Sequence, residues 1–597
     1  MTPPTNRRRA LWVATGVAGL TGVVGLAALG GLAARDDKSG ETQRVAENHA
    51  AAPQNASDTR KDGEKGEGKD AHDEQNRADE HGRDGKDRGD WDRGKPGEER
   101  DEHGRRVREV PCSDEKLVEA IDLANRDHGG TLKLSPHCVY ELDFADKKSG
   151  TALPTIRQEI KIKGNDATIK RDSEDAFRLF RVADGGELTL KDLTLKDGNA
   201  AEFKYGSAPT TPSASGPQVP GSGPQAEPMV PKPPEKEKKE GEADGGAILV
   251  ERGGSAHLEQ VKLTRNNAEG NGGAIANFGR VDLDDSKVED NHAQKNGGGI
   301  FNVGVLKVKE SRINNNTAGK NGGGIANGEG KEKEKGKDGK DYWVKGHDEA
   351  GTVEIIGRFE GKEVGKSEIE NNRAGKNGGG VFSSGGFVKI TLTSIKNNTA
   401  CENGGGIYAH NTDLDLQKVL IAKNHADKDG GGVYNTGGEK KKEAPYADQK
   451  EEKKKEEEKE QEATATIADS AVLENTAGRF GGGIFNGDPD VKIKEGFLES
   501  DKDKEDKDKE DNATLTVRDT EIKANTALNG GGIFNNEGRV TLTKTRIIKN
   551  TATDSAKTHR VAGGVFNNDG KVKLDEKTVI ADNDPTNCGG TVKDCFN

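Results

Sequence analysis

A short glycine-rich motif recurs along this chain of 597 residues more regularly than any other feature. Two or three glycines, sometimes followed by alanine, precede an isoleucine or valine ten times. These aliphatic residues are Ile248, Ile275, Ile300, Ile325, Val381, Ile407, Val433, Ile484, Ile533 and Val565. Where no charged block intervenes, the intervals between them are 27, 25, 25, 26 and 26 residues. A fixed period of this length is typical of a protein that stacks one structural unit repeatedly along an axis.

Each unit contains the same elements in the same order. An asparagine lies eight or nine residues before most of the aliphatic residues, an aromatic residue often follows directly, and a second asparagine often comes two residues later. A stretch of alternating apolar and polar residues follows, which is the pattern of a half-buried strand. About 25 residues with strand-like rise form one coil of three short strands and three bends, and coils stack about 4.8 Å apart. The repeat therefore predicts an all-β protein, a single-stranded parallel β-helix.

Stacked coils place equivalent side chains above one another, so we expect an aliphatic stack and several ladders. The aromatic ladder would contain Phe301, Phe382, Tyr408, Tyr434, Phe485, Phe534 and Phe566. A structural asparagine ladder would contain Asn277, Asn302, Asn327, Asn435, Asn486, Asn535 and Asn567. The asparagines before the glycines are Asn267, Asn316, Asn372, Asn398, Asn424, Asn475 and Asn525. Asparagine tolerates left-handed dihedrals at bends and can hydrogen-bond to its counterpart in the next coil, so ladder roles are expected rather than ligand binding.

An amphipathic helix is predicted at the N-terminal end of the coil. Composition changes at Val110, and Ser113 is a good N-cap residue. The apolar residues Leu117, Ala120, Ile121 and Ala124 follow at helical spacing. Such a helix would cover the apolar interior and the unpaired strand edge of an open β-helix end.

The five cysteines are consistent with an oxidising compartment. Cys112 and Cys138 flank the cap helix and the first strand, while Cys588 and Cys595 lie near the end of the sequence. We expect one short-range disulfide at each end of the coil, where each would oppose fraying. Cys401 is left over, and we expect it to be a small buried residue rather than a nucleophile.

Residues 1–34 have the composition of a targeting segment. Three arginines precede a stretch of about 25 uncharged apolar or small residues, which is long enough to span a bilayer. A cleaved signal peptide and a retained signal anchor of residues 10–34 therefore both remain open. The three arginines and the following Ala-Leu-Trp loosely resemble a twin-arginine export motif. Either form predicts an exported protein located outside the cell or at its surface, with membrane contact only through this segment.

The remaining sequence divides by composition. Residues 35–108 form a charged linker that we expect to be disordered. Residues 109–205 would contain the cap and first coils, 206–240 a Pro/Ser/Lys/Glu-rich insertion, and 241–597 the repeats. Charged insertions near 329–348, 439–462 and 499–512 should leave from one side of the coil and act as spacers. The net charge of −13 disfavours nucleic acid and anionic membranes as partners.

Several motifs resemble the repeats of the chlamydial polymorphic outer membrane protein family and of actinobacterial secreted β-helix proteins. The residues that carry this resemblance are the Gly-Gly-Ala-Ile of 272–275 and the Gly-Gly-Ile-Phe-Asn of 298–302, 482–486 and 531–535. The region between Cys112 and Cys138 is similar to the N-terminal cap of the second group. The resemblance covers residues 110–597 and implies a right-handed, pectate-lyase-like solenoid. Members of the first family are surface adhesins, and fold analogy alone does not transfer that function.

Polysaccharide-cleaving enzymes with this fold need carboxylates clustered on an outer face. Candidates are Asp282, Asp284 and Asp285 on one coil and Asp413 and Asp415 on another, and we expect these coils to be too far apart to form one site. His292, His410 and His425 lack metal-ligand spacing. We therefore assign no catalytic residue, cofactor or metal from the sequence.

The sequence favours an exported, non-catalytic β-helix scaffold, a surface or adhesin-like protein. Its expected partners are cell-wall or extracellular polysaccharide or a surface protein. The alternatives are a polysaccharide-active enzyme, a lyase or glycoside hydrolase, and a cell-wall-binding module that acts through the charged loops.

Overall fold

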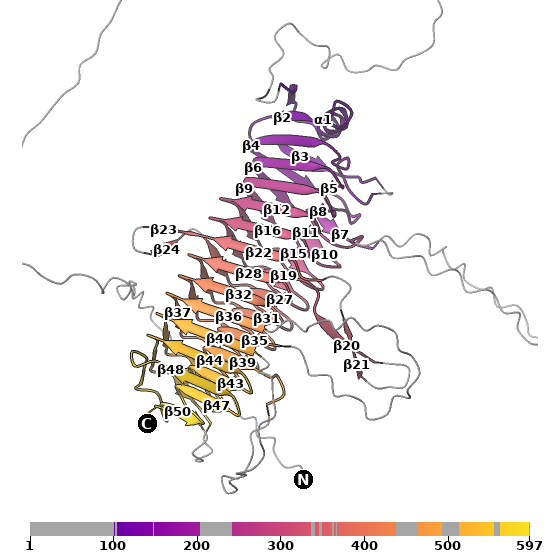
Figure 1. Cartoon of the computed structure of the whole chain (residues 1–597). Helices are drawn as coiled ribbons and strands as arrows, with labels where there is room; N and C mark the ends of the chain where they lie inside the picture. The colour runs from indigo at the N-terminus through magenta and orange to yellow at the C-terminus, as the bar shows by residue number, and fades with distance from the viewer. Residues whose placement is uncertain are drawn as a thin grey trace, which may run out of the picture. The chain divides into compact units, whose positions relative to one another are not determined.

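The described part of the chain contains one β-helix, whose coils are stacked along a single axis (Figure 1). The computed structural model describes residues 101, 104–146, 149–202, 241–335, 341–345, 349–360, 363–365, 367–437, 463–491, 513–554 and 561–595. Three parallel sheets run along the stack. The predicted all-β fold, a parallel β-helix with a helix at its N-terminal end, is confirmed.

The first sheet, called the large sheet below, has 24 strands, two from most coils. Its strands are β1 (Val107–Val110), β2 (Gly130–Leu134), β3 (Val139–Leu142), β4 (Glu159–Arg171), β6 (Glu187–Lys196), β9 (Ser255–Thr264), β12 (Arg280–Asp284), β13 (Lys287–Glu289), β16 (Val305–Lys309), β17 (Arg312–Asn314), β22 (Thr352–Ile356), β25 (Glu368–Glu370), β28 (Phe387–Thr391), β29 (Ser394–Lys396), β32 (Asp413–Gln417), β33 (Leu420–Ala422), β36 (Ala463–Ala468), β37 (Ala471–Leu473), β40 (Ala513–Arg518), β41 (Glu521–Lys523), β44 (Arg539–Thr543), β45 (Arg546–Ile548), β48 (Lys571–Leu574) and β49 (Val579–Ala581).

The second sheet, called the aromatic sheet below, has 12 short strands that include the repeated aliphatic and aromatic residues. They are β5 (Phe180–Val182), β8 (Ile248–Val250), β11 (Ile275–Asn277), β15 (Ile300–Asn302), β19 (Ile325–Asn327), β27 (Val381–Ser384), β31 (Ile407–His410), β35 (Val433–Thr436), β39 (Ile484–Gly487), β43 (Ile533–Asn536), β47 (Val565–Asn568) and β50 (Cys588–Gly590).

The third sheet, called the small sheet below, consists of 10 two-residue strands. They are β7 (Asn199–Ala200), β10 (Asn267–Ala268), β14 (His292–Ala293), β18 (Thr317–Ala318), β26 (Arg373–Ala374), β30 (Thr399–Ala400), β34 (His425–Ala426), β38 (Thr476–Ala477), β42 (Thr526–Ala527) and β46 (Thr551–Ala552).

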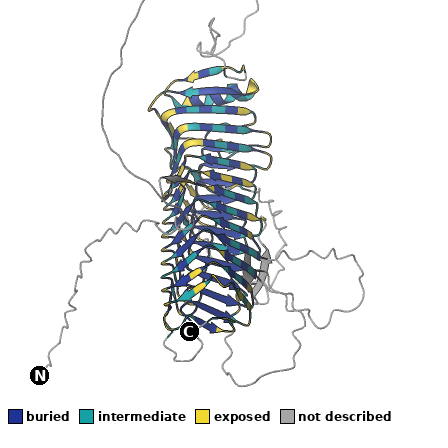
Figure 2. Ribbon diagram, turned by 60° about the vertical axis from the view of Figure 1, so that its left-hand side comes forward, coloured by how far each residue is buried: buried dark blue, intermediate teal, exposed yellow. Residues whose placement is uncertain are grey.

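Strand alternation decides which side chains enter the interior of the coil. In β12, Val281 and Leu283 are buried, whereas the residues between and beside them lie on the outer surface. Each repeated aliphatic residue pairs in register with its counterparts, as Ile300 does with Ile275 and Ile325. Buried residues therefore form continuous rows along the stack, which Figure 2 shows in dark blue.

The repeated glycines are required because neighbouring coils approach closely at this bend. A Cβ atom on Gly298 would lie 2.4 Å from the carbonyl oxygen of Gly323 in the next coil. The preceding Gly297 has a φ of 68°, a conformation that side chains rarely adopt. Both conditions recur in most coils, so any residue larger than glycine would separate the coils locally.

The left-handed residues at the bend before the small sheet differ from the prediction. The ladder asparagines were expected at bends because asparagine tolerates left-handed dihedrals, but the residues directly before Asn316, Asn372 and Asn398 take these dihedrals instead. Asn315 and Asn397 have φ values of 55° and 53°. The ladder asparagines keep negative φ because their side chains must point into the stack, and the residue before them makes the bend.

The N-terminal end is covered by α1 (Asp114–Arg126). Its buried residues are Leu117, Ala120, Ile121 and Ala124, the four that the helical spacing predicts. Ser113 occupies the N-cap position in an extended conformation, but its side chain makes no capping hydrogen bond. Because α1 contacts β1, β2, β3 and β4, it covers the apolar interior at this end.

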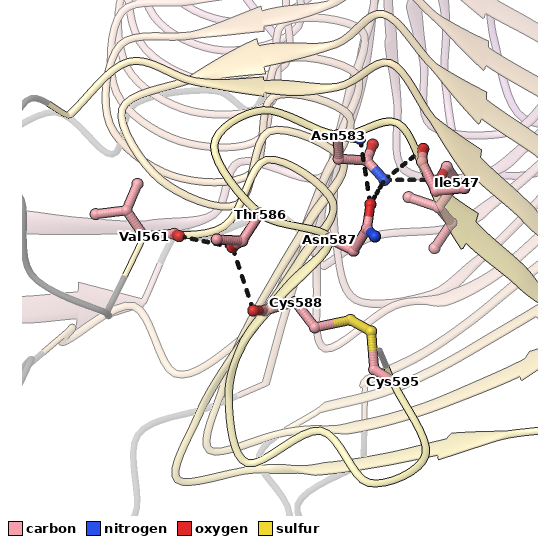
Figure 3. Close-up of a disulfide and its surroundings, with 8 residues drawn as sticks. Ile547, Val561, Asn583, Thr586, Asn587, Cys588 and Cys595 are labelled. Carbon is pink, nitrogen blue, oxygen red and sulfur yellow. Dashed lines mark hydrogen bonds between the residues drawn. A yellow bond between two sulfur atoms is a disulfide. The ribbon is translucent and has the colours of Figure 1, made fainter. Parts of the chain in front are cut away.

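Both ends of the coil are cross-linked by a disulfide. Cys112 and Cys138 are joined beside α1 with their Cα atoms 5.7 Å apart. Cys588, the first residue of the last aromatic-sheet strand, and Cys595 close a short loop (Figure 3). Next to this loop, the Thr586 hydroxyl donates a hydrogen bond to the carbonyl of Val561 at 3.0 Å. The last coil is therefore tied to the one before it.

The charged insertions leave the coil at one kind of bend, from an aromatic-sheet strand to the large sheet. They follow β19, β35 and β39, and the chain returns in β22, β36 and β40. The first contains an antiparallel hairpin of β20 (Lys331–Lys335) and β21 (Asp341–Lys345), which was not predicted. A second hairpin that the sequence analysis missed, β23 (Arg358–Glu360) and β24 (Glu363–Gly365), interrupts the large sheet.

Other predictions lie outside the described residues. These are the targeting segment 1–34, most of the linker 35–108, the insertion 206–240 and the charged blocks 439–462 and 499–512. Within the described ranges, no helix is long and apolar enough to cross a membrane.

Candidate binding groove on the aromatic sheet

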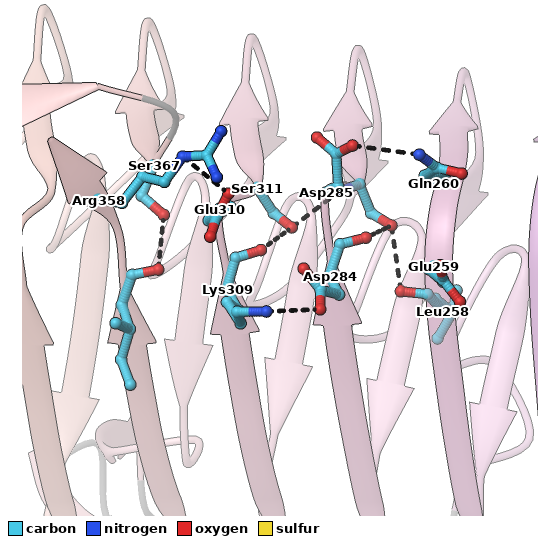
Figure 4. Close-up of polar contacts among 12 residues, drawn as sticks. Leu258, Glu259, Gln260, Asp284, Asp285, Lys309, Glu310, Ser311, Arg358 and Ser367 are labelled. Carbon is cyan, nitrogen blue, oxygen red and sulfur yellow. Dashed lines mark hydrogen bonds and ion pairs between the residues drawn. The ribbon is translucent and has the colours of Figure 1, made fainter. Parts of the chain in front are cut away.

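The carboxylates that the sequence proposed as enzyme candidates lie on the outer face of the large sheet. The carboxylate of Asp284 pairs with Lys309 Nζ of the next coil at 2.9 Å, and Asp285 accepts a hydrogen bond from Gln260 at 3.4 Å (Figure 4). Asp282 contacts Arg280 Nη2 at 2.9 Å and His257 Nδ1 at 3.0 Å. Each of the three therefore has a partner within its own coil or an adjacent one.

Of the second pair of candidates, Asp415 belongs to the same column of the large sheet as Asp282, whereas Asp413 belongs to the column of Arg280. Asp413 accepts a hydrogen bond from Thr464 at 2.9 Å, and Asp415 lies 3.7 Å from Lys389. Strand register connects the two groups through a column of alternating charge. From one coil to the next the column reads His257, Asp282, Lys307, Glu354, Lys389 and Asp415. Opposite charges in directly paired strands stabilise the sheet, which explains these carboxylates without a catalytic role.

The three histidines do not come together. His292 and His425 lie exposed on the small sheet, and His425 contacts Asp427 at 3.0 Å. His410 ends β31 on the aromatic sheet. Within the part of the chain that the structure describes, no group of three or more His, Cys, Asp and Glu residues is arranged to hold a metal ion.

The asparagine ladder of the aromatic sheet is present in two segments. Asn277 Nδ2 donates to Asn302 Oδ1 at 2.7 Å, Asn302 donates to Asn327, and Asn327 donates to the Ser383 hydroxyl. The second segment runs through Asn435, Asn486, Asn535 and Asn567 at 2.7–2.8 Å. Between them the ladder position is Ala409, which has no amide. Among the described residues, the buried Oδ1 of Asn435 therefore has no donor.

A longer ladder follows the bend before the small sheet and contains no interruption. Its members are Asn266, Asn291, Asn316, Asn372, Asn398, Asn424, Asn475, Asn525, Asn550 and Asn583. Asn267 was predicted to belong to this row, which is wrong, because Asn267 is exposed and its neighbour Asn266 is fully buried. Asn266 and Asn267 are adjacent, so the spacing of the repeat fits both of them to within one residue. Only the position of the bend decides which of the two side chains points into the stack.

A third amide ladder was missed altogether. Each member precedes a repeated glycine, and the row comprises Asn271, Asn296, Asn321, Asn377 and Asn403. It begins at Asp244, whose carboxylate accepts the backbone N–H of Asn271, and ends at Asp429. The repeated asparagine directly before the glycines was the available signal, and no role was predicted for it.

The predicted aromatic ladder lies on the outer side of the aromatic sheet. In each strand the aliphatic residue points into the coil, so the aromatic residue that follows it points outward. The rings stack almost in parallel, with centroids 5.2 Å apart for Phe382 and Tyr408 and 5.1 Å for Tyr408 and Tyr434. Although they point outward, Phe382 and Tyr434 are only 3% and 2% exposed. The row continues through Phe485, Phe534 and Phe566.

A cavity of ≈ 710 Å³ lies over this row, and we call it the aromatic groove. Five successive coils contribute its lining residues, so it runs along the axis of the β-helix. They are Asn321, Gly330, Lys376, Asn377, Phe382, Ser384, Glu402, Asn403, Tyr408, His410, Lys428, Tyr434, Thr436, Gly437, Pro489 and Asp490. Gly330, Gly437 and Asp490 lie where the three charged insertions leave the coil. The groove is therefore bordered by the bases of all three insertions.

Burial dominates the electrostatics of the groove. It raises the pKa of the Tyr408 hydroxyl, and it raises the pKa of Tyr434 well above its ordinary value, with the neighbouring tyrosine adding to the shift. Burial also raises the pKa of Asp429 at the end of the third ladder, although its ion pair with Arg479 opposes the change. Both phenols therefore stay protonated at neutral pH.

Cys401 lies in the coil that contributes Glu402 and Asn403 to the groove. It was expected to be buried, but its side chain is only half-buried and accepts a hydrogen bond from Arg373 Nη2 at 3.3 Å. Ala400, one residue earlier, takes the inward position, so strand alternation turns the thiol outward.

The fold and these ladders define a repeat protein of the parallel β-helix class. Residues 393–410, which form part of one coil and include Tyr408 and His410, match the Chlamydia polymorphic membrane protein repeat. No curated protein matches the chain.

Two solved structures are similar to this chain at the level of fold. One is the A-module of the Azotobacter vinelandii mannuronan C-5 epimerase AlgE6, with 14% identity over 78% of this chain and 94% of that chain and a TM-score of 0.31. The other is PfbA, a surface adhesin of Streptococcus pneumoniae, with 11% identity over 78% of this chain and 89% of that chain and a TM-score of 0.27. At these values neither likeness bears on function.

Proposed function

We propose that this protein is an exported binding scaffold at the cell surface, which holds an extracellular polymer without changing it chemically. The aromatic groove carries the proposal, because it is a long cavity with apolar and polar lining residues, whereas the five candidate carboxylates of the large sheet each have a partner. Concave sites with an apolar floor and a few polar groups are the usual form of a binding site. The composition of residues 1–34 supports export.

The proposal is tested with the full-length secreted protein and a panel of insoluble cell-wall and extracellular polysaccharides. Retention on the polymer and release of soluble reducing ends are measured in the same samples. We expect retention on at least one polymer without release of reducing ends. Absence of retention on every polymer would contradict the binding role.

One observation favours a second candidate, a polysaccharide-active enzyme. The imidazole of His257 lies between two carboxylates, 3.0 Å from Asp282 and 3.5 Å from Glu187, with Arg280 next to Asp282. A histidine held by a carboxylate can act as a general base. If the protein cleaves polysaccharide, His257→Ala will abolish product release and Asp413→Asn, five coils away, will leave it unchanged. We favour the scaffold because the His257 cluster lies on the open face of the large sheet.

A further inference from the structure

We infer that the aromatic groove binds an unbranched, uncharged glycan chain lying parallel to the axis of the β-helix. The inference rests on the proposed binding function and assigns that function a site and a ligand class. It is based on four properties of the groove: its period, its unused hydrogen-bonding groups, its charge balance and the lack of a free strand edge.

The groove repeats with the period of the coils. Two successive coils contribute the same set of groups, an amide from the third ladder on one side, a ring on the floor and a polar residue on the other side, and the next coil contributes the ring and the polar residue, Tyr434 and Thr436. In the coil of Val381 these are Asn377, Phe382 and Ser384. Successive sets are about 4.8 Å apart, which is close to the length of one sugar ring in an extended chain. A polymer with one sugar per coil would therefore meet a ring and a polar residue at three successive steps, and a ladder amide at two of them.

The groove contains hydrogen-bonding groups that the protein itself leaves unused. Tyr434 is 2% exposed, and within the described part of the chain neither its hydroxyl nor that of Tyr408 has a hydrogen-bond partner. Tyr140 shows the usual arrangement, because its buried hydroxyl donates to the Val110 carbonyl at 3.1 Å and accepts from the Ser135 N–H at 3.2 Å. Tyr408 is half-buried and neither phenol oxygen is a fully buried atom, so both hydroxyls are accessible from the groove and can pair with the hydroxyl groups of a ligand.

The amides of the groove wall also keep donor capacity. Asn403 Nδ2 donates one hydrogen bond to Asn377 Oδ1 at 3.2 Å, and Asn377 donates in the same way to Asn321 at 3.3 Å. A side-chain amide has two N–H groups, so each of these residues has one N–H beyond its ladder bond. Together with the phenols and Ser384, they form rows of donors and acceptors of the kind that sugar hydroxyls need.

The charges of the groove cancel. Its lining contains two lysines, Lys376 and Lys428, and two carboxylates, Glu402 and Asp490. Lys428 Nζ lies 3.3 Å from Glu402, so this pair is already neutralised. A charged polymer would meet as many like charges as opposite ones, whereas an uncharged polymer would not.

A peptide fits the groove less well. Extended peptides bind β-proteins mainly by adding a strand at a free sheet edge. The strands that form the floor, β27, β31 and β35, are each paired on both sides, so they have no free edge here.

The inference is tested by isothermal titration calorimetry of the full-length protein with cellohexaose, chitohexaose and xylohexaose. The double variant Tyr408→Phe/Tyr434→Phe removes both unpaired hydroxyls and keeps the ring stack. We expect at least one neutral hexasaccharide to bind and the double variant to weaken its binding at least tenfold. The matched control is Thr466→Val, which removes a hydroxyl from the large sheet and should leave the affinity unchanged.

Three results would overturn the inference. They are no binding of any neutral hexasaccharide, equal affinity of the double variant, or preference for the polyanion hexagalacturonate. Binding of a synthetic peptide of residues 439–462, lost in the double variant, would also overturn it by assigning the groove to the chain's own insertion. The thermal unfolding temperature of the double variant is the folding control. If it equals that of the wild-type protein, a loss of affinity is not caused by a loss of folded protein.

The same variants separate this inference from the proposed function. If wild type and double variant are retained equally on a cell-wall polymer, the scaffold role stands and the groove is not its site. If the wild-type protein is retained on none of the polymers, the scaffold role itself fails.

Discussion

The large sheet and the aromatic sheet belong to the same coils, yet their outer faces are built differently. The outer face of the large sheet is a grid of charged and hydroxyl side chains that pair from coil to coil in contact with solvent. The outer face of the aromatic sheet is a stack of buried rings with the groove above it. Both faces arise because equivalent residues stack from coil to coil, so periodicity alone does not distinguish a solvated face from a binding face.

The difference follows from where the insertions leave the coil. All three charged insertions begin at the aromatic sheet, and their bases border the groove. The long strands of the large sheet are interrupted only once within the described ranges, by the β23–β24 hairpin. We therefore expect substitutions on the aromatic sheet to have larger effects on stability than equivalent ones on the large sheet.

Phe485→Ala should have the largest effect. Phe485 is fully buried, with its ring centroid 4.5 Å from that of Tyr434 and 5.8 Å from that of Phe534. Removing it leaves a cavity in the stack and should lower the free energy of unfolding by about 3–5 kcal/mol. Urea unfolding followed by circular dichroism measures the change. Thr466→Ala on the large sheet is the control, and a comparable loss in that variant would contradict the contrast between the faces.

Asn424→Ala in the long ladder should lower the free energy of unfolding by about 3 kcal/mol, because it leaves several buried partners unpaired. Asn424 Nδ2 donates to Asn475 and to the Ile395 carbonyl, and its Oδ1 accepts from Asn398. Asn267→Ala, at the exposed neighbouring position of an earlier coil, should change stability by less than about 0.5 kcal/mol. Similar effects in urea unfolding would show that the ladder contributes no more than surface asparagine.

Ala409→Asn should repair the interrupted ladder of the aromatic sheet. The new amide would donate to the unpaired Oδ1 of Asn435, as Asn435 itself donates to Asn486. We expect a gain of about 1 kcal/mol in the free energy of unfolding. Ala409→Leu is the control for size alone and should destabilise. A loss of stability in the asparagine variant would show that this coil is too tightly packed for an amide.

Two aspartates should respond to pH in opposite directions. Burial raises the folded-state pKa of Asp429, so its ionised form is disfavoured, and its contribution to stability grows as pH falls through the raised pKa. Hydrogen bonds from Thr578 and Lys544 lower the pKa of Asp575, so the stability it adds is lost as pH falls through that lowered value. Unfolding of Asp429→Asn and Asp575→Asn between pH 2 and 7 measures both. If the two substitutions changed the pH dependence of the free energy of unfolding in the same direction, the predicted opposite responses would be contradicted.

Lys389→Gln should have the smallest effect. Lys389 and Asp415 are partly exposed and 3.7 Å apart, so water and salt screen the pair. We expect a loss of no more than about 0.5 kcal/mol, and a smaller one in high salt. A larger loss that persists in high salt would show that the charge column stabilises the large sheet as strongly as the rings stabilise the other face.

Much of the fold could be predicted because the residues that each coil requires recur in the sequence of every repeat. The ten aliphatic positions gave the coil length, and the cysteines at both ends gave the cross-links. The features that the sequence did not predict either occur only once or depend on which residue makes a bend. The β23–β24 hairpin has no repeated signal, and Asn266 differs from Asn267 only in which residue makes the bend.

The sequence by itself determined the period, the stacking of like residues and the positions where the insertions interrupt the coil. Only the tertiary structure decided which ladder faces outward, where the unpaired phenols lie and that three insertion bases border one groove. The physical reason is that periodicity specifies the neighbour along the axis, whereas the direction of a side chain depends on the phase of each bend. That phase is set by closure of the whole coil, to which residues from all three sheets contribute.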